Sequence, residues 1–417
     1  MQASFYSGNR RRLYASLQPY SVTLVFAGLA PFKTGDELYP YFAERNFVYL
    51  TGLHEASQGF ILMAEVDEKG NATETVFIQP PDKMIERWTG RRLTPEEVTS
   101  ISGIENISFL GDFEQAFHKA AVKANLLYLD LDKLIPGEHE NDAYRFREKA
   151  TIEYPYLSIQ SIRGKLRRQR TIKQPCEIEA LRVAEDITRD GILAMMKAAK
   201  PGITEYELKA EYDYALTRRG ILSPGFPSII SVGENNFCIH YYAYTGVSKD
   251  GDMVLNDVGG IWDGLIADVS RAWPVNGHFN EKQRALYTCI YNTSNYMFSL
   301  IKPGMRMGDV DLTARKYNCE QLKKLGLLES YDEIGKYMWH GGSHHIGFDV
   351  HDIVDYYPDL IIAPGMVFCV DIGVYVEEWG IGFRLEDNCL VTEDGCENLS
   401  AAIPRSIEEI EAFMNAE

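Results

Sequence analysis

Histidines are concentrated in one short stretch of this 417-residue chain. Residues 339–352 read WHGGSHHIGFDVHD and hold four of the nine histidines: His340, His344, His345 and His351. Glycines and bulky apolar residues separate them. Imidazole is the commonest metal ligand in proteins, and it exchanges protons near neutral pH. The stretch is therefore a candidate for metal binding or acid–base chemistry.

Four acidic residues of the same half of the chain stand in apolar, strand-like surroundings: Asp257, Asp268, Asp371 and Glu386. Carboxylates are rarely buried unless they are paired or bind a metal. One of them alone would be typical of a turn or a strand edge that faces water. Asp257 and Asp268 fit a hairpin that turns at Trp262–Asp263–Gly264 and brings the two carboxylates together. Four carboxylates with an imidazole favour a site for Mn, Fe, Co or Zn, with enough negative charge for two divalent ions.

The acidic residues lie in two segments that resemble each other. Lys-Pro-Gly occurs at 200–202 and again at 302–304, each time between two helical patterns. Farther on come MVLNDVG (253–259) and MVFCVDIG (366–373), and each leads to a second acidic strand, GLIADVSRAW or GIGFRLEDN. This pattern predicts a duplicated helix–hairpin unit. A long helix is expected to begin at Pro175, and Thr204 with Glu207 predicts a capping box for the next one.

The first 165 or so residues predict a separate domain of mixed α/β structure. SVTLVFAG and NFVYLTGL are expected to be strands, and residues 59–81 a hairpin that turns at 68–71. Thr94 with Glu97 predicts a helix start. The basic segment RGKLRRQRTIKQP (163–175) is interpreted as a solvated connector rather than an anion site. The expected domains are 1–168 and 169–417.

Composition limits the partners. The formal net charge is −18, which argues against nucleic acid, because phosphate binding needs a basic face. No stretch predicts a signal peptide or a membrane span. The seven cysteines have no paired spacing, which is typical of reduced thiols in a cytoplasm. We therefore expect a cytoplasmic protein with no membrane partner.

Several motifs resemble one known family over nearly the whole chain. HGGSHHIGFDVHD resembles the His-Gly-x-Ser-His-x-x-Gly-x-Asp-Val-His-Asp motif of aminopeptidase P (Xaa-Pro aminopeptidase), and DVGGIWDGLIADVSRAWPVNGHF resembles its Asp-x-Gly…Asp-Ile-Thr-Arg segment. GFRLEDN resembles the family's Ile-Arg-Ile-Glu-Asp, and RWTGRRL its Trp-x-Gly-x-Arg segment. The resemblance implies an α+β architecture, in which a creatinase-like N-terminal domain precedes a pita-bread catalytic domain.

The resemblance also implies roles for individual residues. The metal ligands would be Asp257, Asp268, His344, Asp371 and Glu386, with Asp268 and Glu386 bridging two divalent ions. Manganese is the expected metal, with cobalt, zinc or iron as alternatives. The catalytic residues would be His240, His351 and Glu386: His240 polarises the scissile carbonyl, His351 holds the substrate and Glu386 moves the proton. The remaining matches would bind the substrate or line its pocket: His340, Tyr375, Arg384 and Trp88. His345 is expected only to pack.

The implied activity is release of the N-terminal residue from peptides with proline in second position, by attack of a metal-bound hydroxide. Two alternatives stay open: a prolidase that cleaves Xaa-Pro dipeptides, and a weakly active or inactive homologue that serves as a binding protein. Ser343 in HGGSH fits the aminopeptidase better than the prolidase pattern. A homodimer or homotetramer is expected.

One position departs from the family pattern. Asp371–Ile372–Gly373 replaces the family's Glu-Pro-Gly. Aspartate is one methylene shorter than glutamate, so its oxygens reach less far from the same strand. The departure predicts weaker binding of the ion on the His344 side.

Overall fold

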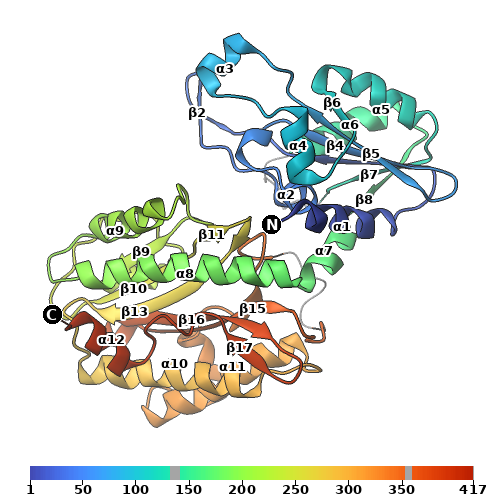
Figure 1. Ribbon diagram of the computed structural model, residues 1–417. Helices are drawn as coiled ribbons and strands as arrows, with labels where there is room; N and C mark the ends of the chain where they lie inside the picture. The colour runs from blue at the N-terminus through green and yellow to red at the C-terminus, as the bar shows by residue number, and fades with distance from the viewer. Residues whose placement is uncertain (132–140, 353–358, 417) are drawn as a thin grey trace. The chain divides into compact units, whose positions relative to one another are not determined.

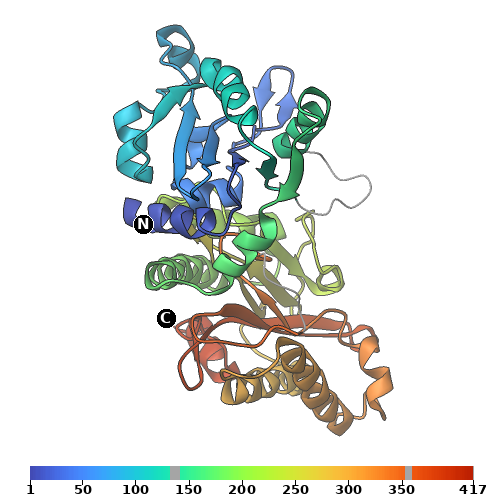
Figure 2. The same cartoon turned by 90° about the vertical axis from the view of Figure 1, so that its right-hand side faces the viewer.

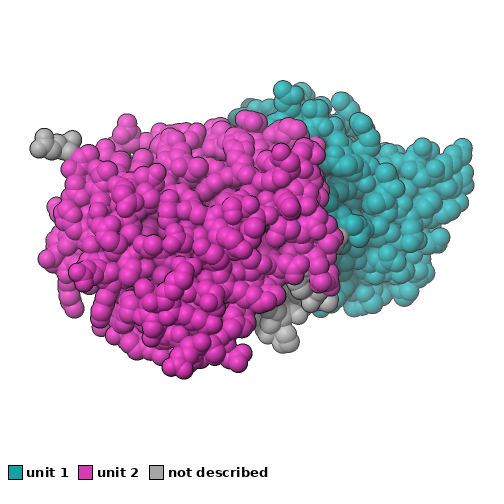
Figure 3. Space-filling model, turned by 90° about the horizontal axis from the view of Figure 1, so that it is seen from below, with its two compact units in different colours: residues 1–169 teal, residues 170–417 magenta. Residues whose placement is uncertain are grey.

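The computed structural model describes residues 1–131, 141–352 and 359–416. The chain divides into two compact units, residues 1–169 and 170–417 (Figure 3). The sequence predicts a domain boundary after residue 168. None of the helices in the described part of the chain has the length and apolar character of a transmembrane segment.

Unit 1 is built on a six-stranded mixed sheet of order β6-β5-β4-β1-β7-β8 (Figure 1). Its strands are β1 (Ser21–Phe26), β4 (Ile61–Val66), β5 (Ala72–Ile78), β6 (Ile107–Phe109), β7 (Leu126–Leu129) and β8 (Ser158–Ser161), and a small hairpin joins β2 (Phe32–Thr34) to β3 (Glu37–Leu38). The helices are α1 (Ala3–Tyr14), α2 (Arg45–Thr51), α3 (Lys83–Thr89), α4 (Pro95–Ser102), α5 (Phe113–Ala121), α6 (Asp142–Glu153) and α7 (Arg163–Thr171), which crosses the division between units. The predicted β4–β5 hairpin and the Thr94–Glu97 capping box are both present.

The strand predicted from NFVYLTGL is wrong, because residues 45–51 form the helix α2. All seven residues of this short helix are buried, so the segment has no polar face and no 3.6-residue periodicity. A short, continuous apolar run does not distinguish a buried helix from a buried strand. Gly52 ends the helix in the left-handed conformation, with φ of 72°.

Unit 2 places two helix pairs on opposite sides of its strands (Figures 1 and 2). One pair is α8 (Pro175–Ala198) with α9 (Glu205–Arg218), and the other is α10 (Glu281–Leu300) with α11 (Met307–Lys324). The strands are β9 (Ile229–Val232), β10 (Met253–Val258), β11 (Ile261–Trp262), β12 (Leu265–Ile266), β13 (Val269–Pro274), β14 (Ser343–His345), β15 (Val367–Val376), β16 (Ile381–Val391) and β17 (Cys396–Asn398), and α12 (Ile407–Met414) follows. Each helix pair thus precedes an antiparallel hairpin, as the duplicated pattern predicts.

Two larger sheets supply most strands of unit 2, with orders β13-β10-β9 and β14-β15-β16-β17, and β11 pairs with β12 in a separate two-stranded sheet. β13 and β16 lie next to each other, so the sheets meet along these strands. Every residue of β15 and of β16 is buried. α10 packs on both of these strands, and α8 and α9 pack on β13 and β9. Side chains that point between the sheets are therefore shielded from water, and any charged group there needs a partner.

The basic segment between the units is not a solvated connector as predicted, because Arg170 and Lys173 are buried. Both contact the buried carboxylate of Asp352: Arg170 Nη2 lies 2.5 Å from Oδ1 and Lys173 Nζ lies 2.8 Å from Oδ2. The main-chain N–H of Asp352 donates to the carbonyl of His345. Two cations from the start of unit 2 therefore anchor the end of the histidine-rich segment.

Candidate metal centre

A hollow of about 380 Å³ in unit 2 collects most of the predicted site residues. The predicted residues in its wall are His240, Asp257, Asp268, His340, His344, His351, Asp371, Arg384 and Glu386. Tyr375 lies just behind this wall, where its hydroxyl accepts from Arg384 Nη1 at 3.1 Å. These residues come from both sheets and from the loops between their strands, so the fold brings together groups that are far apart in sequence.

Strand register explains how the carboxylates converge. Asp371 on β15 pairs directly with Glu386 on β16, so their side chains share one face of the sheet. Between β10 and β13 of the other sheet, the tight turn at Asp263–Gly264 joins the short strands β11 and β12 and returns the chain from Asp257 to Asp268. The predicted hairpin therefore exists, and its two carboxylates face Asp371 and Glu386.

Four potential ligand atoms lie close enough to hold one ion. They belong to Asp268, His344, Cys369 and Glu386, and all of them lie within 4.8 Å of one another. His344 Nε2 is 3.1 Å from Glu386 Oε1 and 3.5 Å from Asp268 Oδ2. Asp268 and Glu386 are almost completely buried, with 3% and 2% of their surface exposed.

The buried carboxylates of the site have fewer cationic and hydrogen-bonding partners in the protein than they need. Burial and the neighbouring carboxylates of Glu386 and Asp257 raise the pKa of Asp268 well above its usual value. Burial and the nearby Asp371 raise the pKa of Glu386. Among the described residues, Asp257 Oδ1, Asp268 Oδ1 and Asp371 Oδ1 are buried without a hydrogen-bond partner. Unpartnered, mutually repelling carboxylate oxygens around one space fit a divalent cation.

Arg384 on β16 orients the carboxylate side of the site. Its Nη2 donates to Asp257 Oδ2 at 2.7 Å, and its Nε donates to Ser270 Oγ at 3.0 Å. Ser270 Oγ in turn donates to Glu386 Oε2 at 2.9 Å. The guanidinium thereby fixes one oxygen of Asp257 directly and one of Glu386 through a hydroxyl, which leaves Asp257 Oδ1 and Glu386 Oε1 toward the centre of the site.

His340 contacts Asp371 in this structure. Its Nδ1 lies 2.9 Å from Asp371 Oδ2, and its Nε2 lies 3.3 Å from the Tyr375 hydroxyl. Gly373 makes room for the imidazole, because a Cβ there would be 2.2 Å from His340 Nε2. Burial raises the pKa of Asp371, but the cationic neighbours His340 and Arg384 outweigh it, so the net pKa lies below its usual value.

The other histidines of the motif differ in environment. His351 lies beside His344, with 4.6 Å between ring centroids, and burial together with His344 lowers its pKa. His345 is buried against Phe368, and burial lowers its pKa to about 3, so it is a neutral packing group as expected. His240 stacks on Tyr242 at the wall of the hollow. Trp88 belongs to unit 1, where α3 leaves it 85% exposed; its role in substrate binding stays a prediction.

Several groups that support the site carry no sequence signal of their own. Asn388 holds the backbone of Asp268 by two hydrogen bonds: its Oδ1 accepts from the Asp268 N–H at 3.1 Å, and its Nδ2 donates to the Asp268 carbonyl at 2.5 Å. Cys369 enters the cluster because it is the cross-strand partner of His344. Pairing between β14, β15 and β16 would have identified both residues, but the sequence does not reveal that register.

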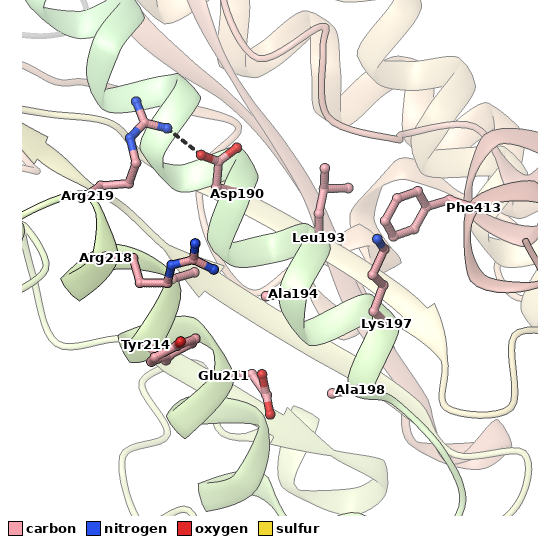
Figure 4. A pocket seen from close by; sticks show the side chains of 11 residues that line it. Asp190, Leu193, Ala194, Lys197, Ala198, Glu211, Tyr214, Arg218, Arg219 and Phe413 are labelled. Carbon is pink, nitrogen blue, oxygen red and sulfur yellow. Dashed lines mark hydrogen bonds and ion pairs between the residues drawn. The ribbon is translucent and has the colours of Figure 1, made fainter. Parts of the chain in front are cut away.

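A larger hollow of about 770 Å³ lies elsewhere in unit 2, between α8, α9 and α12 (Figure 4). An ion pair between Arg219 and Asp190 lies in its wall, and Lys197 stacks over the Phe413 ring. It shares no wall residue with the metal centre. Its wall holds no histidine and none of the converging carboxylates of the metal centre, so its larger volume does not make it the functional site.

Comparison with known proteins agrees with this geometry. Residues 179–393 match the model of metallopeptidase family M24, and residues 6–128 match the aminopeptidase P N-terminal domain. The chain belongs to metallopeptidase family M24. The Xaa-Pro aminopeptidase of Escherichia coli K12 is 30% identical to this M24 peptidase over 98% of this chain and 96% of its own length.

Solved structures show the same architecture along the whole length of this M24 peptidase. A Bacillus anthracis protein solved as a candidate aminopeptidase P has a TM-score of 0.95 at 36% identity, and the match covers 99% of this chain and 98% of that one. Escherichia coli aminopeptidase P with the inhibitor Pro-Leu has a TM-score of 0.92 at 29% identity, with the same coverage. The predicted α+β architecture and the resemblance to aminopeptidase P are therefore confirmed, and the family implies a divalent metal.

Proposed function

We propose that this M24 metallopeptidase is an Xaa-Pro aminopeptidase, which releases the N-terminal residue from peptides with proline in second position. The observation that carries the proposal is the convergence of Asp257, Asp268, His344 and Glu386 on one buried space with unpartnered carboxylate oxygens. The names of the similar proteins supply the substrate class. No feature of the described residues favours a prolidase.

The buried carboxylates would hold two divalent ions, with manganese as the proposed metal. Asp257, Asp268, His344 and Glu386 would hold these ions, with Asp257 and His344 on opposite sides of the site. When bound, such ions supply Lewis acidity that activates water and polarises a carbonyl. The ions would also offset the repulsion between carboxylates that raises the pKa values of Asp268 and Glu386.

The protein's own groups would position the peptide and move protons. His351 lies next to His344, and its lowered pKa keeps the imidazole neutral at pH 7, which suits a hydrogen bond to the substrate. His240, on the wall near Asp257, would donate to the carbonyl oxygen as negative charge develops there. Glu386 would carry the proton from water to the leaving nitrogen. Phe226, Pro227 and Tyr242 give the hollow an apolar wall against which a rigid proline ring can pack.

The test compares three peptides that differ only around the proline. The protein is incubated with manganese and with Xaa-Pro-Xaa, Xaa-Ala-Xaa and Xaa-Pro, and the products are identified by mass spectrometry. The proposal predicts release of the first residue from Xaa-Pro-Xaa and little from Xaa-Ala-Xaa. Cleavage of the dipeptide alone would show a prolidase, and cleavage of none with metal bound would show a binding protein.

Three further proposals concern the whole protein. The two compact units would be the N-terminal and the catalytic domain, and the division would lie between residues 168 and 169. All seven cysteines are free thiols, which fits the proposed cytoplasmic location. A homodimer or homotetramer is proposed, and light scattering of the protein as it elutes from a size-exclusion column would give the mass of the assembly.

A further inference from the structure

Cys369 lies on the same face of the sheet as the proposed metal ligands. It precedes Asp371 by two residues on β15, so the two side chains point to one side. His344 is its direct partner on β14, and Asn388 is its direct partner on β16. The thiol is fully buried, and its sulfur lies beside His344 and the carboxylates of Asp268 and Glu386.

The sulfur lies close to the ligand atoms of the other members of the cluster. The ligand atoms of Asp268, His344, Cys369 and Glu386 lie within 4.8 Å of one another. In a tetrahedral site with metal–ligand distances of 2.0–2.3 Å, ligand atoms are about 3.3–3.8 Å apart. An ion would need to draw these four atoms together by about 1 Å, which side-chain rotation can supply.

Asp371, by contrast, has one of its two carboxylate oxygens engaged elsewhere. It is not part of the group of four, and its Oδ2 is 2.9 Å from His340 Nδ1. His340 holds Oδ2, so only Oδ1 of this short side chain remains toward the hollow, and it is not among the four close ligand atoms. On that face Cys369, rather than Asp371, thus supplies the donor atom that belongs to the close group.

We propose that Cys369 is a ligand of the His344-side metal ion, in the position that the shortened Asp371 does not reach. Cys369 would give up its thiol proton to solvent and hold the ion as a thiolate. Asn388 Nδ2 donates to Cys369 Sγ at 3.4 Å, and this contact orients the sulfur. A sulfur ligand changes the preference of this position toward cobalt or zinc and away from manganese. This inference rests on the proposed metal site and deepens it.

Cobalt reports a sulfur ligand directly, because thiolate-to-cobalt charge transfer absorbs in the near ultraviolet. The metal-free full-length protein is titrated with Co²⁺ and its absorption spectrum recorded, while bound cobalt is measured separately. Wild-type protein is expected to gain the charge-transfer band with one of the bound ions. Cys369→Ser is expected to lose the band and to lower the Zn²⁺-over-Mn²⁺ affinity ratio of that position at least tenfold.

Cys389→Ser is the matched control. Cys389 is equally buried on β16 but pairs with Phe368, so it occupies the opposite face of the sheet from Cys369. This variant should keep the band. If Cys369→Ser does not fold, the wild-type spectrum still shows whether a sulfur binds cobalt, and the Cys389→Ser spectrum shows whether Cys389 supplies that sulfur.

The outcomes separate this inference from the proposed function. Wild-type protein that binds cobalt and cleaves Xaa-Pro-Xaa without a charge-transfer band would overturn the sulfur ligand and leave the peptidase intact; the thiol would then only donate to Glu386. A band that survives in folded Cys369→Ser would also overturn it. Failure to bind cobalt at all would overturn the metal site itself.

Discussion

The free energy of unfolding of unit 2 is expected to fall as pH rises, and replacing Glu185 by glutamine is expected to remove much of this fall. Glu185 lies in α8, and its carboxyl group is buried. Burial raises its pKa from 4.5 to about 8; Asp387 adds to the rise, while Ser400 and Arg271 oppose it. The folded protein therefore keeps this carboxyl group protonated at pH 7, whereas the unfolded chain ionises it.

The magnitude follows from this difference in proton binding. Below pH 4.5 the carboxyl group is protonated in the folded and the unfolded state, so its contribution to the free energy of unfolding does not change with pH. Between pH 4.5 and pH 8 each unit of pH lowers the free energy of unfolding by about 1.4 kcal/mol. Above pH 8 the loss is constant. Glutamine does not ionise. From pH 5 to pH 7 the free energy of unfolding of the variant should therefore rise by about 3 kcal/mol relative to that of the native protein.

Urea unfolding at pH 5, 6, 7 and 8, followed by tryptophan fluorescence, measures this gain. Four of the five tryptophans belong to unit 2: Trp262, Trp273, Trp339 and Trp379. The control is Glu179→Gln in the same helix, where the side chain is exposed and no gain is expected. If the Glu185→Gln and native curves stay parallel from pH 5 to pH 7, the buried carboxyl group is ionised in the folded protein and the explanation is wrong.

Three further outcomes concern the metal centre. His344→Ala should abolish peptide cleavage while circular dichroism stays native, because it removes the imidazole ligand; near-native turnover would refute that assignment. His351→Ala should lose at least tenfold in kcat and keep its metal by elemental analysis, since it faces the substrate; metal loss would mean that the two histidines have exchanged roles. Calorimetric titration of metal-free protein with Mn²⁺ should show one tight and one weaker site, and Asp371→Glu should tighten the weaker one; two equal sites in the native protein would contradict this.

The sequence is most informative where chemistry and periodicity coincide. The hairpin that carries Asp257 and Asp268 is predictable, because a polar Asp-Gly turn separates two apolar strands. Capping boxes locate the starts of α4 and α9 for a similar reason: the side chains that satisfy the first N–H groups of a helix are local in sequence. The histidine motif indicates a site by its composition alone, since four imidazoles in an apolar stretch have few structural uses.

Contacts between distant segments account for most of the places where the structure differs from the predictions made from the sequence. The charges of Arg170 and Lys173 suggest a solvated connector, but Asp352, far along the chain, provides a buried partner for both. Such a pair cannot be recognised from either segment alone. Removing one partner would leave a buried charge uncompensated, which costs about 3–5 kcal/mol. The helix α2 is not recognisable in the sequence, because burial on all sides erases its periodicity.

Cys369 shows a third limit. In the sequence it is one of seven scattered thiols, and nothing local distinguishes it. Only the register that places it opposite His344 brings its sulfur to the carboxylates. Likewise, the one-methylene change at Asp371 is visible in the sequence, but its partner His340 is not.

Metal-dependent cleavage after the first residue of a proline peptide is the most direct test of the proposed function. The protein is stripped of metal with a chelator and then titrated with Mn²⁺, while release of the first residue is followed for Xaa-Pro-Xaa and Xaa-Ala-Xaa. We expect no activity in the stripped protein, recovery with added Mn²⁺, and strong preference for the proline peptide. Full activity without metal, or equal rates on the two peptides, would contradict an Xaa-Pro aminopeptidase built on these carboxylates and His344.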